Sequence, residues 1–354
     1  MTPLAEILAR QIAATGPMTV AEYMAACLMH PRHGYYTTRD PLGAAGDFIT
    51  APEISQMFGE LIGLALAQSW IERDRPDPFA LAELGSGRGT LMADALRATR
   101  AVPGFHGAMR LALVEVSPPL RVAQARALAG YAPTFCDTVE ALPDAGPLFL
   151  IANEFFDALP VRQFLRDGEG WRERMVGLQD GALGFALAEV TRYAELEPRL
   201  ADTGPGHMIE TSGAARAVAA TIGDRIASRG GVALMFDYGQ DGLLGDTFQA
   251  VRGHEKENPL ARPGQADLTA HVDFGALAEA APCAASTVTP QGVWLERLGI
   301  TDRARTLARG LTGTELETHV AAHRRLTHPE EMGHLFKVMS FHDEIGPPPG
   351  LEAR

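Results

Sequence analysis

The chain of 354 residues contains few cysteines and almost no lysine. Its three cysteines, Cys27, Cys136 and Cys283, lie far apart and form no CxxC pair, which argues against a zinc site or a redox pair and predicts a reducing compartment. The only lysines are Lys256 and Lys337, and the formal net charge is −13. An acidic chain of this kind is poorly suited to non-specific binding of nucleic acid.

Long apolar runs are also missing. No stretch of about 18 apolar residues occurs, so the sequence predicts no membrane span. The first ten residues include Glu6 and lack a basic segment followed by an apolar run, so we expect neither a signal nor a transit peptide, and a cytoplasmic location. The apolar fraction of 46% is typical of a folded protein, and the length fits one large α/β domain or two smaller ones.

The central motif is a glycine-rich turn that follows an apolar strand ending at Glu83 and precedes a helix starting near Thr90. Glycines at 85, 87 and 89 let the backbone turn sharply and approach a ligand, and the free N–H groups of the helix face the same point. The spacing GxGxG differs from the GxGxxG of dinucleotide-binding folds, which argues against a dehydrogenase. Because Glu83 suits a ligand with a cationic amino-acid part, the turn predicts S-adenosylmethionine (SAM) as cofactor. A plain tight strand–helix turn is the alternative.

Strands and helices alternate after this motif. We expect strands at 79–83, 110–116, 133–136 and 148–152, which predicts an α/β fold with a parallel sheet and helices on both faces. Ligands of such sheets bind beyond the carboxyl ends of the strands. The polar groups at these ends are Glu83, Glu115, Asp137 and the segment Asn153–Asp157. Glu115 is placed to accept hydrogen bonds from ribose hydroxyls, whereas Asp137 is either an acceptor for an adenine amino group or a turn residue.

Two further segments depart from this alternation. From about 160 to 205, apolar residues recur at every second position and Asp-Gly pairs mark the turns, which predicts an inserted antiparallel, β-rich lid. Residues 240–266 are polar and rich in glycine, which predicts a long loop of the kind that is usually functional or mobile.

Two acids flank the start of an apolar helix that we expect to follow Thr50 or Ala51, with Pro52 at its first position, and to run to Trp70. These acids are Asp47 and Glu53. From spacing alone, a turn former and a partner of the helix dipole are favoured over carboxylates that line a pocket.

Six segments together resemble the MidA family: GDFITAPEISQMFGELIG at 46–63, ELGSGRGT at 83–90, LVEVS at 113–117, ANEFFDALP at 152–160, DYG at 237–239 and DLTAHVDF at 267–274. The resemblance covers nearly the whole chain. It implies a class I, Rossmann-like SAM-dependent methyltransferase with a seven-stranded, mostly parallel sheet. It also implies an N-terminal helical extension, which we place at 1–75, packed on a methyltransferase core at 76–354. Mitochondrial members of the family are described as SAM-dependent methyltransferases that assist complex I assembly by symmetric dimethylation of an arginine on a core subunit.

The resemblance also assigns cofactor-binding residues. Gly85, Gly87 and Gly89 match the SAM loop, and Glu115 matches the ribose-binding acid. The segments 46–55 and 267–274 match family signatures without assigned roles. Together with Glu83 and Asp137 from the strand ends, these residues form the expected cofactor site.

The catalytic assignment rests on the motif after the fourth strand. Asn153, Glu154 and Asp157 match the family motif beside the transferred methyl group. Paired carboxylates bind a guanidinium bidentately and spread its charge, so we expect Glu154 and Asp157 to act first and Glu53 and Asp47 next.

The acceptor stays open at this point, because the cofactor turn reports the methyl donor and not the acceptor. The favoured partner is a protein substrate, a complex I subunit or its bacterial equivalent. Methylation of a small molecule is one alternative, and a SAM-binding assembly scaffold without turnover is another. We expect a bacterial cytoplasmic protein rather than one of the mitochondrial matrix, where the eukaryotic relatives reside, and no metal.

Overall fold

The computed structural model describes residues 2–38 and 50–354, which pack as two compact units. The first unit combines the N-terminal residues up to 48 with 157–215 and 242–271, and the second combines 49–156, 216–241 and 272–354. This division differs from the expected boundary near residue 75, because the helices between 51 and 72 belong to the second unit and pack on its other helices.

The second unit is built on a mixed sheet in the strand order β15-β17-β10-β5-β2-β3-β4. The strands are β2 (Phe79–Leu84), β3 (Met109–Val114), β4 (Thr134–Cys136), β5 (Leu148–Asn153), β10 (Gly231–Gln240), β15 (Ala284–Ala285) and β17 (Phe336–His342). The strands from β10 to β4 pair in parallel, and β17 pairs antiparallel with β10 and β15. The short strands β14 (Val272–Asp273) and β16 (Thr289–Pro290) pair beside this path, so the sheet has nine strands where the sequence predicted seven.

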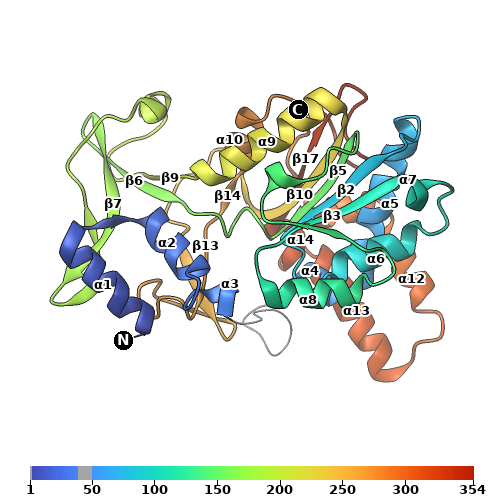
Figure 1. Ribbon diagram of the computed structural model, residues 1–354, viewed down its shortest axis with the longest axis horizontal. Helices are drawn as coiled ribbons and strands as arrows, with labels where there is room; N and C mark the ends of the chain where they lie inside the picture. The colour runs from blue at the N-terminus through green and yellow to red at the C-terminus, as the bar shows by residue number, and fades with distance from the viewer. Residues whose placement is uncertain (1, 39–49) are drawn as a thin grey trace. The chain divides into compact units, whose positions relative to one another are not determined.

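Helices cover both faces of this sheet, as the alternating pattern predicted. They are α4 (Ala51–Ile54), α5 (Gln56–Glu72), α6 (Thr90–Thr99), α7 (Phe105–Ala108), α8 (Pro118–Ala127), α9 (Gly213–Arg229), α10 (Phe274–Ala280), α11 (Gln291–Arg297), α12 (Ile300–Leu307), α13 (Gly313–Thr327) and α14 (Met332–Leu335). Figure 1 shows α9 and α10 on one side of the strands and α6 and α8 on the other. Leu81 of β2, Ile151 of β5 and Leu234 of β10 belong to one apolar core. Ile62 of α5 and Leu96 of α6 are part of the same core. The carboxyl ends of the parallel strands are thereby fixed at one edge.

The helix expected from Pro52 to Trp70 is broken at Ser55. There the backbone is extended, with φ −159° and ψ 137°, and the Ser55 hydroxyl accepts a hydrogen bond from the N–H of Met57 at 3.3 Å. The serine therefore caps α5, and the preceding four residues form the separate helix α4. The prediction of one continuous helix was wrong, because a residue that can cap its own following turn offers the backbone an alternative to helix continuation.

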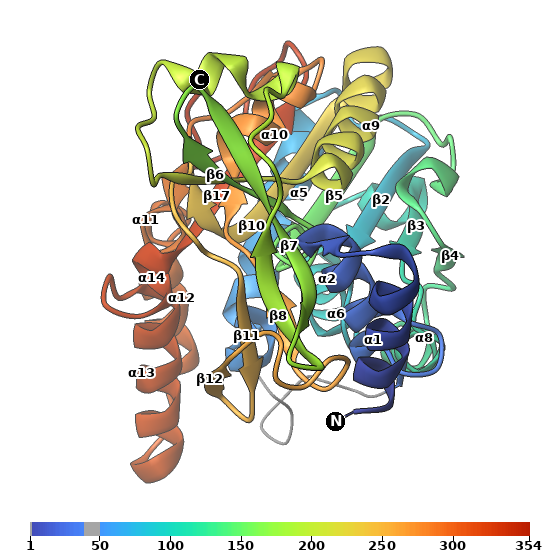
Figure 2. The same ribbon diagram turned by 90° about the vertical axis from the view of Figure 1, so that its left-hand side faces the viewer.

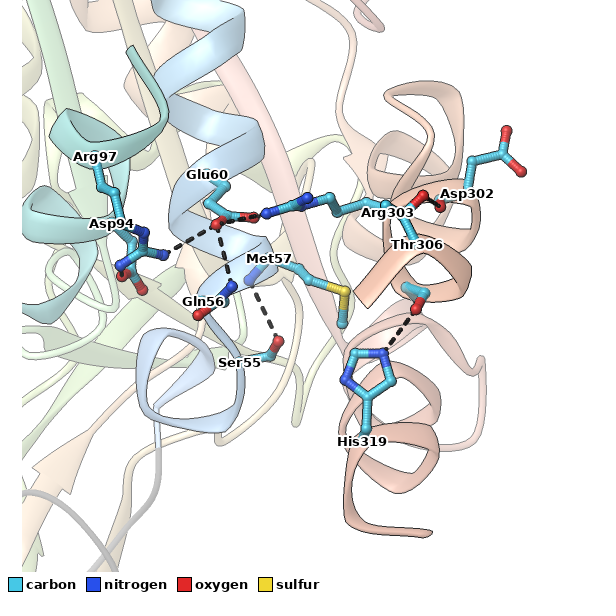
Figure 3. A network of polar contacts seen from close by, with 11 residues as sticks. Ser55, Gln56, Met57, Glu60, Asp94, Arg97, Asp302, Arg303, Thr306 and His319 are labelled. Carbon is cyan, nitrogen blue, oxygen red and sulfur yellow. Dashed lines mark hydrogen bonds and ion pairs between the residues drawn. The ribbon is translucent and has the colours of Figure 1, made fainter. Parts of the chain in front are cut away.

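A buried carboxylate ties three helices of this unit together (Figure 3). Glu60 of α5 is 4% exposed and accepts hydrogen bonds from Arg303 of α12, at 2.8 and 3.0 Å, and from Arg97 of α6, at 3.0 Å. Burial alone would raise the pKa of Glu60, but the two guanidinium groups outweigh burial and lower it. The ion pairs are half-exposed on the arginine side, so each contributes less than a fully buried pair.

We expect Glu60→Ala to lower the free energy of unfolding by about 2 kcal/mol, because the arginines lose their shared acceptor and a buried site is emptied. Urea unfolding at pH 7 measures the loss. Because the pKa of Glu60 is lowered in the folded state, its contribution is present above the unfolded-state pKa and is lost as pH falls through the folded-state pKa. The matched control is Asp302→Ala, which removes an exposed pair with Arg305 and should change stability by less than about 0.5 kcal/mol. An equal loss of unfolding free energy in Glu60→Ala and Asp302→Ala would contradict a stabilising role for the buried Glu60 carboxylate.

The first unit combines helices with two antiparallel sheets (Figure 2). Its elements are α1 (Pro3–Thr15), β1 (Met18–Thr19), α2 (Val20–Met29), α3 (Tyr35–Thr38), β6 (Arg162–Asp167), β7 (Gly170–Gln179), β8 (Ala182–Leu187), β9 (Met208–Thr211), β11 (Gln249–Arg252), β12 (Glu255–Glu257) and β13 (Asp267–Thr269). One sheet has the order β1-β7-β6-β9 with β8 paired to β7, and the other has the order β12-β11-β13. Side chains of α1 and α2 form an apolar core with residues of these strands. The β-rich insertion predicted from the sequence is present.

The segment predicted as a long loop at 240–266 contains a hairpin. Strands β11 and β12 pair antiparallel around Gly253 and His254, which both have positive φ values of 57° and 65°. Two successive residues with positive φ form the turn that matches the twist of two-residue hairpins. The sequence pattern was weak here because the strands have three or four residues each and are mostly polar. Among the residues that the structure describes, no helix is both long and apolar enough to cross a membrane.

Candidate cofactor and catalytic site

The glycine-rich turn joins the end of β2 to the start of α6, as predicted. Gly85, Gly87 and Gly89 all have positive φ, at 63°, 51° and 83°. Gly89 directly precedes Thr90, the first residue of α6. A side chain at Gly85 would also place its Cβ 3.1 Å from the ring of Phe155, which is tighter than ordinary contact. The turn therefore requires glycine for its backbone conformation, and it brings the free N–H groups of α6 to the carboxyl edge of the sheet.

Glu83 is the last residue but one of strand β2, two residues before the first glycine of the turn, and is almost completely buried, with 3% exposure. Burial raises the pKa of this carboxyl group to about 8, and the nearby charge of Glu115 adds to the increase. Burial has removed this carboxyl group from water, which disfavours its charged form. A cationic ligand group beside it favours the carboxylate again, so the two groups bind well.

Glu115, one residue after β3, is also buried and is held in a fixed orientation. Its Oε1 accepts a hydrogen bond from the N–H of Ser117 at 2.8 Å, and its Oε2 accepts one from Gln124 Nε2 at 3.0 Å. Gln124 Nε2 also donates to the carbonyl oxygen of Gly87 at 2.8 Å, so one side chain connects this acid to the glycine turn. Each carboxylate oxygen retains a second lone pair for a ligand hydroxyl.

Asp137, directly after β4, has a different environment. Its side chain is 80% exposed and forms an ion pair with Arg121 at 2.6 Å. Arg121 also donates to the backbone carbonyls of Glu115 and Cys136. Adenine binding by Asp137 stays a prediction.

Asn153 and Glu154 stand at the end of β5. Asn153 Nδ2 donates to Glu154 Oε1 at 3.1 Å, and the N–H of Ala51, the first residue of α4, donates to the same oxygen at 3.3 Å. Glu154 has a positive φ of 51°, which is uncommon for a residue with a side chain. Strained backbone of this kind concentrates at functional sites, because the surrounding contacts must over-determine it.

The short helix α4 brings a second acid to this edge. Glu53 Oε1 accepts a hydrogen bond from the Thr90 hydroxyl at 2.7 Å, at the first residue of α6. The four residues of α4 thus contact Glu154 through Ala51 and the cofactor turn through Glu53. Helix α4 therefore binds one carboxylate through the N–H of its first residue and carries the other on its third residue.

Two further acids, Asp157 and Asp47, were predicted to be catalytic. Asp157 belongs to the first unit, where its side chain is buried and its backbone carbonyl accepts a hydrogen bond from the N–H of Ala270. In the same unit, the hydroxyl of Tyr36 donates to the buried Asp267 at 2.7 Å. Asp47 lies outside the described residues. Catalytic roles for these acids stay predictions.

Several buried polar atoms at the carboxyl edge provide a test of whether a cofactor fits. Glu83 Oε2, Ser117 Oγ, Gln124 Oε1 and Asn153 Oδ1 are buried and find no hydrogen-bond partner within the part of the chain that the structure describes. Buried polar groups without partners are rare in proteins and indicate a ligand or water. SAM carries an ammonium group, a carboxylate, two ribose hydroxyls and an adenine, and its donors match the carboxylate and amide oxygens found here. The residues present fit the cofactor.

Comparison with known proteins decides the family. Residues 61–293 match the model of a family described as "Putative S-adenosyl-L-methionine-dependent methyltransferase". The chain is 37% identical to "Protein arginine methyltransferase NDUFAF7, mitochondrial" of Danio rerio, over 94% of this chain and 85% of that protein. It is 36% identical to the human protein of the same name, over 96% of this chain and 83% of that protein. The chain belongs to the MidA family of SAM-dependent methyltransferases.

Solved structures agree with this assignment. A crystal structure of a Burkholderia thailandensis protein described as a "likely methyl transferase", bound to S-adenosyl-homocysteine, matches 98% of this chain and 93% of its own with a TM-score of 0.84 and 31% identity. A native crystal structure of a protein from the same organism matches with a TM-score of 0.81, also at 31% identity, over 99% of this chain and 94% of its own. The MidA chain described here is therefore an enzyme of the SAM-dependent methyltransferase fold, and SAM is its cofactor, as the glycine spacing predicted.

The sequence missed three residues that shape the site. Gln124 is completely buried on α8, Thr90 binds Glu53, and the ring of Phe155 lies against Gly85. Gln124 is spaced four residues after the buried Leu120, so a polar residue on the inward face of the helix was the available signal. The roles of Thr90 and Phe155 depend on contacts between segments far apart in the chain and had no local signal.

The raised pKa of Glu83 predicts that this MidA protein releases a proton when it binds SAM. With a pKa of about 8, Glu83 is mostly protonated at pH 7, and a cationic ligand group favours the carboxylate, so the proton must leave. We expect about one proton released per SAM at pH 7 and an affinity that rises as pH increases toward 8. Calorimetry in two buffers of different ionisation enthalpy measures this release. Glu83→Gln should abolish it and the exposed Glu72→Gln should not; equal heats in both buffers for the wild type would contradict the prediction.

Proposed function

We propose that this MidA protein transfers methyl groups from SAM to an arginine of a protein partner. The similar proteins of Danio rerio and human are named protein arginine methyltransferases. The observation that carries the proposal is the placement of Glu53 and Glu154 by α4 beside the cofactor turn. Two carboxylates suit a guanidinium, which is planar, carries several donors in a fixed fork and remains protonated at neutral pH.

Within this proposal, each described residue has a defined task. Bound SAM supplies a methyl group on a positively charged sulfur. Glu154 holds the guanidinium nitrogen that receives the methyl and accepts its proton as the new N–C bond forms and the S–C bond electrons return to sulfur. Glu53 binds the remaining N–H groups, and its bond to Thr90 fixes it relative to the cofactor turn. Holding the two reactants in one geometry supplies a large part of the rate enhancement.

The finer assignments belong to the same proposal. We assign symmetric dimethylation and a target on a respiratory complex I subunit or its bacterial equivalent, where methylation supports assembly. We also assign the protein to a bacterial cytoplasm. The three cysteines are all free, which fits a reducing compartment.

Transfer of labelled methyl groups tests the proposal. Purified protein and labelled SAM are added to an extract of cells that lack the endogenous protein, and the labelled species are identified by mass spectrometry. We expect one labelled protein that carries symmetric dimethylarginine. Label in a metabolite alone would replace the protein substrate by a small molecule. Absence of label, with SAM binding confirmed by calorimetry, would favour a scaffold that binds SAM without turnover.

A further inference from the structure

An open groove of about 420 Å³ lies between α4 and α13 in the second unit. Its lining includes Ile54 and Ser55 at the end of α4 and Thr314, Glu315, Thr318 and His319 of α13. The α13 residues are spaced at i, i+1, i+4 and i+5, so they form one stripe along the helix. Of the fifteen residues of α13, Leu326 is the one that is buried, and the helix therefore presents most of its surface to solvent.

Residues in both walls of this groove form hydrogen bonds to the neighbouring helices α5 and α12 (Figure 3). Ser55 caps α5 through the N–H of Met57, and His319 Nε2 lies 3.0 Å from the carbonyl oxygen of Ala304 on α12, to which it donates. The carboxylate of Glu60 in turn joins α5 to α12. Both walls are thus attached to the same helix pair, so the groove exists before anything binds to it.

One wall of the groove belongs to α4, the helix that also contacts the candidate catalytic site. Ile54 in the groove wall is the residue after Glu53, whose carboxylate binds Thr90 of the cofactor turn. At the other end of the same helix, Ala51 binds Glu154. A helix of four residues is about 6 Å long. The groove wall and the contacts to both carboxylates therefore come from neighbouring residues of one short helix.

The charge of the groove selects the chemistry of its occupant. Among the lining residues that the structure describes, Glu315 carries a negative charge and none is lysine or arginine. Glu315 is exposed, and its carboxylate forms no ion pair with any residue that the structure describes. The threonine hydroxyls and the side chain of Ile54 add hydrogen-bonding groups and an apolar contact. This combination suits an extended polypeptide with a basic side chain, because both its backbone and its charge find partners.

We propose that the groove between α4 and α13 binds the segment of the protein substrate next to the target arginine, with a basic side chain of that segment opposite Glu315. This inference rests on the proposed protein substrate and adds where that substrate docks. The groove determines which arginine reaches Glu154, whereas the cofactor site determines only that a methyl group is available. Loss of the groove contact should therefore weaken substrate binding and leave SAM binding unchanged.

Three variants of the full-length protein test the groove. Glu315→Arg reverses its charge, Thr318→Trp fills it, and Glu317→Arg is the matched control, an exposed acid of the same helix that does not line the groove. The assay measures initial labelling of the substrate protein over a dilution series of extract from cells that lack the endogenous protein, with SAM saturating. Calorimetry gives the SAM affinity of each variant.

We expect Glu315→Arg and Thr318→Trp to raise the half-saturating extract concentration by about tenfold, while the plateau rate and the SAM affinity stay close to wild type. Glu317→Arg should stay within about twofold of wild type. If Glu315→Arg and Thr318→Trp behave like the control Glu317→Arg, the groove proposal alone is overturned. Absence of any labelled protein with wild type would overturn the proposed function and the groove proposal with it. A lowered SAM affinity in Glu315→Arg, or a dimer in sedimentation that Glu315→Arg dissociates, would assign the groove to the cofactor or to a second copy instead.

Discussion

Glu154→Gln should abolish most methyl transfer while SAM still binds. Glutamine has the shape of glutamate and keeps an oxygen that can accept hydrogen bonds from Asn153 and from the N–H of Ala51. It has neither the negative charge that holds a guanidinium nor the ability to take its proton. Loss of a positioned proton acceptor typically costs 10²–10⁴ in rate, so we expect a fall of about 100-fold or more in the single-turnover rate at saturating SAM. Labelled-methyl transfer and calorimetry measure the two properties separately.

The outcome of this substitution distinguishes two roles for the acid. Glu72→Gln is the control, because Glu72 is an exposed acid at the far end of α5. A simultaneous loss of SAM affinity in Glu154→Gln would assign Glu154 to the cofactor site. Unchanged transfer would remove it from the mechanism and leave Glu53 as the first candidate.

Sequence patterns predicted the central part of the second unit because the relevant signals are local. The strands β2, β3 and β5 are completely or almost completely buried, which produces continuous apolar runs, and a polar residue stands at or next to the carboxyl end of each. The glycines of the turn have positive φ, a requirement that can be read from residue type alone. Glu83, Glu115 and Asn153 were therefore found at the correct strand ends without any knowledge of contacts.

The division into units could not be predicted in the same way. Three separate segments form the first unit, and the chain passes from one unit to the other between Phe156 and Asp157, inside a motif that appears continuous in the sequence. Nothing in the residue types marks that point. For the same reason the sequence grouped Asp157 with Glu154, although the structure assigns them to different units.

Short elements were a second source of error. Residues 284–290 form two separate pairs, β15 and β16, that both pair with β17, a division that the sequence did not predict. Between them, the N–H and carbonyl of the β17 residue Ser340 bind Ser286. Such interruptions are set by side-chain hydrogen bonds in the folded chain and leave little periodicity to detect. The break at Ser55 has the same origin, and it positions α4 and with it both candidate carboxylates.

Gly87→Val should remove SAM binding without unfolding the protein. Gly87 has a φ of 51°, and a β-branched side chain in this region strains the backbone by about 1–2 kcal/mol and also occupies the side from which a ligand approaches. We expect the affinity for SAM to fall by about 100-fold or more, which corresponds to about 2.7 kcal/mol. Calorimetry measures the affinity, and thermal unfolding measures the strain.

A second glycine separates strain from ligand exclusion in this prediction. Gly299 precedes α12 with a φ of 84° and has open space around it. Gly299→Val should therefore lower stability by a similar amount, because the backbone cost is the same, while SAM still binds. Equal loss of SAM affinity in both variants would show that the effect is global and that Gly87 has no special place in the site.

The same two variants test the scaffold alternative in cells that lack the endogenous protein. If Gly87→Val restores assembly of the partner complex there, holding the partner is sufficient for assembly and SAM is not required. Loss of assembly with this variant, but not with Gly299→Val, would show that assembly depends on the bound cofactor.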